Sequence, residues 1–202
     1  MRILGVDPGL SFTGYGVVDG VSRNPVLVEA GVLKSPASQP LARRLKDLHE
    51  GLVEVIEKTQ PEMMAIEALF SNYRHPTSAI QMGHARGVLL LAASQRGLPV
   101  YDYPPARVKK ALTGGGRATK AQMQSMIQSI FSLEKPPEPP DVADAIAVAL
   151  CHSEAIREGR AMPNTKRKSL PGPIQDAMEK AGAGKRGKSP LDNVIEGIFR
   201  DK

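Results

Sequence analysis

Three runs of apolar residues, separated by turn-forming residues, open the chain and predict three β-strands. They span residues 2–7, 14–19 and 25–34, with Pro8-Gly9 and Asn24-Pro25 in the connections. Because the connections are short, consecutive strands are expected to pair as antiparallel hairpins.

Helical periodicity follows from Leu41 onward. Apolar residues recur every three or four positions over 41–58, which is typical of an amphipathic helix. The later pattern predicts strands at 62–67 and 100–103, and helices at 77–95, about 105–112, 120–131 and 140–157. This order predicts an α/β domain over residues 1–158, with a mixed five-stranded sheet flanked by helices.

The composition changes beyond residue 158, where proline, glycine and lysine replace the periodic apolar positions. We predict that residues 159–202 form a basic, low-complexity tail that is largely disordered. The tail is either a dispensable solubilising extension or a flexible arm that raises affinity for DNA without sequence preference. Apolar residues with helical spacing near its end could dock on a partner or on the body of the protein: Leu191, Val194, Ile195, Ile198 and Phe199.

Charge and composition change this picture only slightly. The 202 residues carry a net charge of +6, which favours a polyanionic partner. Residues 1–152 hold 16 Lys and Arg against 14 Asp and Glu, so much of the excess charge lies beyond them. The single cysteine, Cys151, excludes an internal disulfide, and no apolar stretch is long enough to cross a membrane. A cytoplasmic protein without membrane contact is expected.

Four acidic residues stand at the ends of otherwise apolar elements. Asp7 ends the first strand and Glu67 the fourth, while Asp141 and Asp144 share one face at the start of the last helix. Buried carboxylates are costly unless they are paired or bind a metal. The four acids predict a site for hard divalent cations, foremost Mg²⁺, which prefers oxygen ligands. Two ions about 3.5–4 Å apart would suit hydrolysis of a phosphodiester bond.

Each of these acids also has an ordinary structural explanation. Asp7-Pro8-Gly9 could be a plain turn, and a glutamate that closes a strand is usually solvated. The two aspartates would complement the helix dipole just after Pro139-Pro140. Only the combination of all four acids favours the metal site.

The ordered motifs of the chain resemble those of the RuvC-type Holliday junction resolvases, also called crossover junction endodeoxyribonucleases. These enzymes belong to the RNase H-like (retroviral integrase) superfamily, and the resemblance covers about residues 1–155. The matching segments are Ile3-Leu4-Gly5-Val6-Asp7-Pro8-Gly9, Thr13-Gly14-Tyr15-Gly16, Ile66-Glu67 with Phe70, Gly83-His84-Ala85-Arg86-Gly87, Val108-Lys109, Thr113-Gly114-Gly115-Gly116, Lys120-Ala121-Gln122-Met123 and Asp141-Val142-Ala143-Asp144-Ala145.

The resemblance implies an RNase H-like fold and a homodimeric, Mg²⁺-dependent endonuclease. Such enzymes resolve four-way (Holliday) DNA junctions by symmetric nicks in recombination and repair. Two ions per active site are expected, and Mn²⁺ could substitute for Mg²⁺. The family's four catalytic acids fall on Asp7, Glu67, Asp141 and Asp144, which are therefore the expected metal ligands. The branch-migration complex of RuvA and RuvB is a further candidate partner.

Basic and aromatic residues near these motifs are the predicted DNA contacts. Lys109 and Lys120 flank a glycine-rich loop at 114–116, where phosphates could approach the backbone; the alternative is a solvated charged surface. Phe70 could stack on an unpaired base at the junction centre, although an average phenylalanine packs on the domain edge. Secondary contacts are expected from Arg74, Lys110 and Arg117.

Gly83 and Gly87 lie four residues apart in the helix predicted at 77–95. Small residues at this spacing allow two helices to approach closely. The alternative is a helix that packs only on the core. The resemblance implies that this helix forms a two-fold dimer interface, which suits a symmetric DNA substrate.

Three other functions share parts of the pattern. A related RNase H-like nuclease acting on RNA would use similar acids, and a junction-binding protein could keep the fold without cleaving. An ATPase of the actin or sugar-kinase type also ends its first strand in Asp before Gly, but its second phosphate-binding loop is not visible here. The loop with Phe70, the Lys109 and Lys120 pair and the paired Asp141 and Asp144 favour the DNA resolvase over the RNA nuclease. The presence of all four acids argues against a protein that does not cleave.

Overall fold

The structure, a computed structural model, describes residues 1–21, 24–69, 76–116 and 118–160. The chain divides into two units, Met1–Asn164 and Thr165–Lys202. Residues 161–202 of the predicted tail and the predicted contacts Phe70, Arg74 and Arg117 lie outside the described residues. The elements are β1 (Arg2–Asp7), β2 (Phe12–Asp19), β3 (Val26–Lys34), α1 (Leu41–Thr59), β4 (Met63–Glu67), α2 (Pro76–Gln95), β5 (Val100–Tyr103), α3 (Pro105–Thr113), α4 (Lys120–Ile130) and α5 (Pro140–Arg157).

The five strands form one mixed sheet in the order β3-β2-β1-β4-β5. The first three strands pair antiparallel, as predicted from their short connections. Strand β4 then pairs parallel with β1, and β5 pairs parallel with β4. The largest difference from the predicted bounds is at β2, and the other elements begin and end within one residue of the prediction. Strand β2 begins at Phe12 rather than at Gly14, because Phe12 and Thr13 pair with Lys34 and Leu33 at the end of β3.

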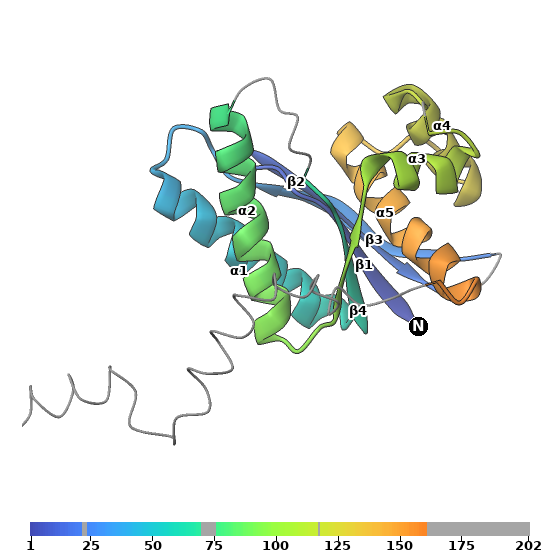
Figure 1. Ribbon diagram of the computed structural model, residues 1–202, viewed down its shortest axis with the longest axis horizontal. Helices are drawn as coiled ribbons and strands as arrows, with labels where there is room; N and C mark the ends of the chain where they lie inside the picture. Colours follow the sequence, from blue (N-terminus) through green and yellow to red (C-terminus); the bar gives the residue numbers. More distant parts are fainter. Residues whose placement is uncertain (22–23, 70–75, 117, 161–202) are drawn as a thin grey trace, which may run out of the picture. The chain divides into compact units, whose positions relative to one another are not determined.

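Helices cover both faces of the sheet (Figure 1). On one face Leu4, Val6 and Ile66 pack against residues of α1 and α2. On the other face Ile3 and Ala65 pack against α3, α4 and α5. Because successive side chains of a strand point to opposite faces, the last residues of β1 and β4 share the α5 face with Ile3 and Ala65.

Paired glycines let α5 lie directly on the strand backbones. Gly5 of β1 pairs with Gly16 of β2. A Cβ at Gly5 would lie only 2.1 Å from the backbone oxygen of Ala145, and one at Gly14 only 2.0 Å from that of Asp141. No other residue type fits this approach without a backbone shift, so these glycines set how closely the start of α5 approaches the end of β1.

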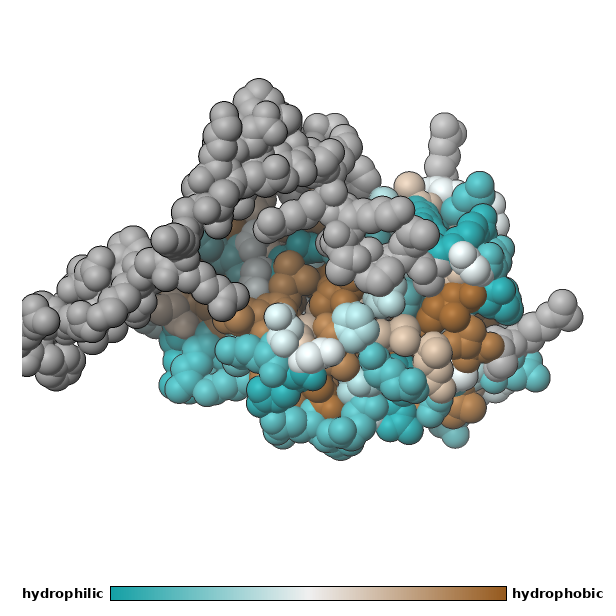
Figure 2. All heavy atoms as spheres, turned by 60° about the horizontal axis from the view of Figure 1, so that its bottom comes forward, coloured by the Kyte–Doolittle hydropathy of each residue, from teal (hydrophilic) through white to brown (hydrophobic). Residues whose placement is uncertain are grey.

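Large apolar side chains reach the surface in several places. Figure 2 shows one face, on which hydrophilic residues predominate and apolar residues form patches between them. No helix in the described part of the chain is long and apolar enough to span a membrane. The exposed large apolar residues in the described ranges are Met1, Phe12, Val26, Val28, Leu41, Ile80, Leu91, Met126 and Ile130.

Candidate active site

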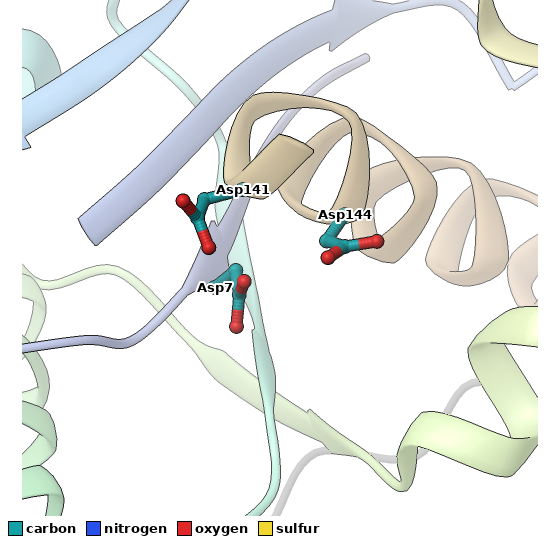
Figure 3. A group of neighbouring side chains, drawn as sticks. All are labelled: Asp7, Asp141 and Asp144. Carbon is teal, nitrogen blue, oxygen red and sulfur yellow. The ribbon is translucent and has the colours of Figure 1, made fainter. Parts of the chain in front are cut away.

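Three of the four predicted acids meet where β1 ends and α5 begins. Figure 3 shows Asp7 at the end of its strand below Asp141 and Asp144 of the helix. Each offers a carboxylate oxygen, and the three oxygens lie within 4.8 Å of one another. Pro139 and Pro140 start the helix, and the three-residue spacing then places both of its aspartates over the sheet edge.

Glu67 joins the site from the neighbouring strand. Strand β4 runs parallel to β1 with Val6 opposite Ile66, so Asp7 and Glu67 occupy adjacent strand ends on the same face. The negative charge of Glu67 makes ionisation of the Asp7 carboxyl less favourable. Glu67 is not among the three acids whose oxygens lie within 4.8 Å, and it stands at the margin of that group.

The acids hold more negative charge than their surroundings compensate. Burial, followed by repulsion from Glu67, Asp144 and Asp141, raises the pKa of Asp7 to about 8. Burial, followed by repulsion from Asp144, raises the pKa of Glu67 to about 7. Burial also raises the pKa of Asp144. An all-oxygen donor set with this excess charge fits a hard divalent cation such as Mg²⁺ or Mn²⁺.

Two of the predicted basic contacts face this site. The Lys120 ammonium lies 3.6 Å from a carboxylate oxygen of Asp144, and its side chain is 66% exposed. Attraction from Lys109 and Lys120 opposes the rise in the pKa of Glu67. Helix α4 is fixed at this point by a capping box between Thr119 and Gln122, which places Lys120 at the first helical position.

The other predicted positions lie away from the acids. Lys110 lines a pocket beside α5 with Arg107 and Cys151. Gly83 and Gly87 lie on the exposed side of α2, and a Cβ added to either would meet no atom within 4 Å.

Comparison with known proteins decides the family. The sequence model of the RuvC family, described as crossover junction endodeoxyribonuclease RuvC, matches residues 3–152. The chain belongs to the RuvC family. The RuvC of Rhodopirellula baltica is 51% identical over 149 residues, which are 74% of this chain and 84% of that protein. The RuvC of Pelotomaculum thermopropionicum is 47% identical over 153 residues, covering 76% of this chain and 93% of that protein.

Solved structures of other proteins carry the same fold. Thermus thermophilus RuvC in complex with a Holliday junction substrate is 36% identical, with a TM-score of 0.73 over 81% of this chain and 99% of that chain. The yeast mitochondrial Holliday junction resolvase matches with a TM-score of 0.55 at 15% identity, which supports the fold alone. The RNase H-like, mixed-sheet fold predicted from the motifs is therefore confirmed.

Two structural supports of the site were not found from the sequence. The Tyr103 hydroxyl lies 2.6 Å from Nδ1 of His152 in the core, and Tyr103 is the cross-strand partner of Glu67. Thr13 is fully buried and donates its hydroxyl to the carbonyl of Gly9, which closes the turn after Asp7. The Tyr103–His152 contact joins β5 to α5, which are far apart in the sequence, and only the Gly9–Thr13 spacing of four residues offered a local signal.

Proposed function

We propose that this RuvC-family chain resolves four-way DNA junctions by cutting one phosphodiester bond in each of two opposed strands. The observation that carries the proposal is the convergence of Asp7, Asp141 and Asp144, with Glu67 beside them, in a fold shared with a relative solved on a Holliday junction substrate. The nuclease domain is proposed to end at about residue 158.

The four acids are proposed to be the metal ligands and the catalytic residues. A divalent cation, Mg²⁺ or Mn²⁺, when bound, supplies a Lewis acid that activates water and stabilises the leaving oxygen. The carboxylates of Asp7, Glu67, Asp141 and Asp144 provide oxygen ligands at fixed positions. The α5 backbone resting on Gly5 and Gly14 keeps the helical pair in register with Asp7.

Lys109 and Lys120 are proposed to position the phosphate beside the acids. Both ammonium groups lie close enough to the acids to influence their ionisation, and Lys120 is free to move because it is largely exposed. When DNA enters, Lys120 can exchange the Asp144 carboxylate for a backbone phosphate. Arg74, Lys110 and Arg117 are proposed as outer phosphate contacts, and Phe70 as a base-stacking residue.

A homodimer is proposed because a two-fold junction needs two related active sites. Helix α2 buries Ala85, Leu89, Ala92 and Ala93 against its own chain, so the core explains that side of the helix. The opposite stripe holds Ile80, Gly83, Gly87 and Leu91, and its two large members are 60% and 50% exposed. A second copy of this stripe would cover the apolar side chains and use the space above the glycines. The RuvA–RuvB complex remains a candidate partner for such a dimer.

The test is nicking of a synthetic four-way junction, with linear duplex and an RNA–DNA hybrid as competing substrates, with and without Mg²⁺. Asp7→Asn, Glu67→Gln, Asp141→Asn and Asp144→Asn should each lower the nicking rate by at least about a hundredfold, because each removes a ligand charge. Binding to the junction should persist, since loss of negative charge does not weaken attraction to phosphate. Asp47→Asn, in a surface ion pair with Arg43, is the control. Preferential cutting of the hybrid, or full activity of two acid variants, would refute the proposal.

A further inference from the structure

An exposed aromatic residue and an exposed lysine stand side by side at the active-site end of the sheet. Phe12 begins β2 and is 52% exposed. Lys34 ends β3, is exposed, and is the cross-strand partner of Phe12. Cross-strand partners point to the same face, with Cβ atoms about 4.5–5.5 Å apart. A ring and an ammonium group are thus presented together.

The strand register places this pair on the same face of the sheet as the acids. Asp7 is opposite Gly14 in the β1–β2 ladder, and Phe12 lies two residues before Gly14, so it points to the same side. Phe12 is therefore roughly 7 Å along β2 and one strand across from Asp7. Because α5 begins over Gly14, it leaves Phe12 uncovered.

A buried arginine fixes the pair from the opposite face. Arg44 of α1 is only 8% exposed and donates to the hydroxyl oxygens of Ser35, at 3.1 Å, and Ser11, at 2.9 Å. These serines adjoin Lys34 and Phe12 in the sequence. The amide of Ser35 also donates to the carbonyl of Ser11. The backbone that carries an exposed phenylalanine is thus held by one of the few buried charged groups in the described residues, an arrangement that pre-organises the exposed pair.

Neither folding nor the four acids explain why an aromatic ring is presented here. An exposed phenylalanine gains little from its own fold, and the neighbouring Thr13 and Leu10 already anchor the turn by burial. DNA offers both of the groups that this pair suits: bases or sugars for the ring, and phosphates for the lysine. In the strand order β3-β2-β1-β4, the pair lies on the other side of Asp7 from Glu67.

We propose that Phe12 and Lys34 form a second DNA-contact platform, which binds the strand that leaves the acids on the β2–β3 side. Phe12 stacks on an unpaired base or packs on a sugar within a few nucleotides of the cut phosphate, and Lys34 contacts a neighbouring phosphate. Arg44 acts as a positioning residue for both. This inference rests on the proposed function, because it assumes a DNA strand at the acids.

The first measurement uses the full-length protein and a four-way junction with 2-aminopurine at successive positions around the cut site, in EDTA to prevent nicking. Wild type should quench the probe at one position, and Phe12→Ala should abolish that quenching and weaken binding roughly 5- to 150-fold. Phe12→Trp should restore both, whereas Phe12→Leu should restore neither, because leucine has no π-face. Lys34→Ala should reduce the salt dependence of binding by about one unit of slope.

Val28→Ala is the matched control, since it removes a 41% exposed apolar side chain from β3 away from the acids. It should leave quenching and salt slope unchanged. Wild-type behaviour of Phe12→Leu, or unaltered binding by both Phe12→Ala and Lys34→Ala, overturns the platform. A changed sedimentation coefficient of Phe12→Ala with normal DNA binding would assign Phe12 to a protein contact and overturn it too. If wild type does not nick junctions, the proposed function fails, and quenching on single-stranded DNA then decides the platform separately.

Discussion

At the scale of single residues, the site gathers carboxylates whose mutual repulsion the folded chain compensates only in part. Asp7 meets three other carboxylates, and Lys120 offsets only part of their charge. Folding therefore favours the protonated acid, and the pKa of Asp7 rises to about 8 from an ordinary value of 3.8. The same repulsion that costs stability in the free protein would favour a divalent cation.

The raised pKa of Asp7 predicts that the stability of the fold falls as the pH rises. Since the pKa of Asp7 is raised in the folded state, that state holds more protons than the unfolded chain between about pH 4 and pH 8, and stability falls as pH rises through this window. At pH 8.5 in EDTA, Asp7→Asn should be more stable than wild type by about 1–2 kcal/mol, and near pH 4 the difference should vanish. Thermal unfolding across this range measures it. Mg²⁺ should stabilise wild type and not the variant; a less stable variant at pH 8.5 would contradict the assigned repulsion.

At the scale of elements, the position of the helical acids depends on how closely α5 lies on the sheet. Gly14 of β2 faces Asp7 across the ladder and lies under the backbone of Asp141. One methyl group at this position would therefore lift the start of α5 and separate acids that come from β1 and α5.

Gly14→Ala should destabilise the fold by about 1–3 kcal/mol, because its Cβ would lie 2.0 Å from the Asp141 backbone oxygen. Nicking should fall further than the loss of folded protein explains, and more Mg²⁺ should be needed for half-maximal rate. Gly115→Ala, where the Cβ would meet no atom within 4 Å, should fold like wild type. Denaturant melts and Mg²⁺ titrations measure both effects. Wild-type Mg²⁺ dependence in Gly14→Ala would show that α5 adapts without disturbing the acids.

The elements could be predicted from the sequence because their signals are local. Apolar periodicity located every helix and strand of the described residues to within two positions, and Pro139-Pro140 marked the start of α5. The acids were found because strand ends and a helix start are visible in sequence. Contacts such as Arg44 with Ser11 and Ser35 could not be predicted, since they depend on how α1 packs under the sheet. Phe12 was missed for the same reason: β2 extends to it only because β3 pairs there.

At the scale of the whole molecule, the dimer is the first prediction to test. Gly87→Leu should fold normally, because its Cβ points to open space in the single chain, but it should block the close approach of a second α2. Wild type should sediment as a dimer at micromolar concentration, and the variant as a monomer that binds a junction yet rarely nicks both strands. Gln81→Leu adds the same side chain to the exposed surface of α2 outside the glycine stripe, and should remain dimeric. A monomeric, fully active wild type would exclude this interface.

The last prediction concerns the segment beyond α5. Helix α5 ends in a closed motif: the amide of Arg160 donates to the carbonyl of Ala155 and that of Gly159 to Ile156, with Gly159 at φ 66°. All four acids, the Phe12–Lys34 pair and the lysines Lys109 and Lys120 lie upstream of this end. The basic residues between positions 161 and 190 outnumber the acidic ones, Asp176 and Glu179: they are Lys166, Arg167, Lys168, Lys180, Lys185, Arg186 and Lys188.

Truncation after Arg160 should therefore leave the melting temperature, the dimer and Mg²⁺-dependent nicking intact. It should weaken binding to junction and to plain duplex by the same factor, most visibly at low salt, because a basic segment without base contacts binds phosphate non-specifically. A full-length variant with Lys166, Arg167 and Lys168 changed to Ala should show part of the same loss, which separates charge from chain length. Binding measured at several salt concentrations on both DNAs distinguishes the alternatives. Loss of junction binding alone would assign the segment a specific role, equal binding by all three proteins would make it a dispensable extension, and a truncated chain that fails to fold would place it in the core.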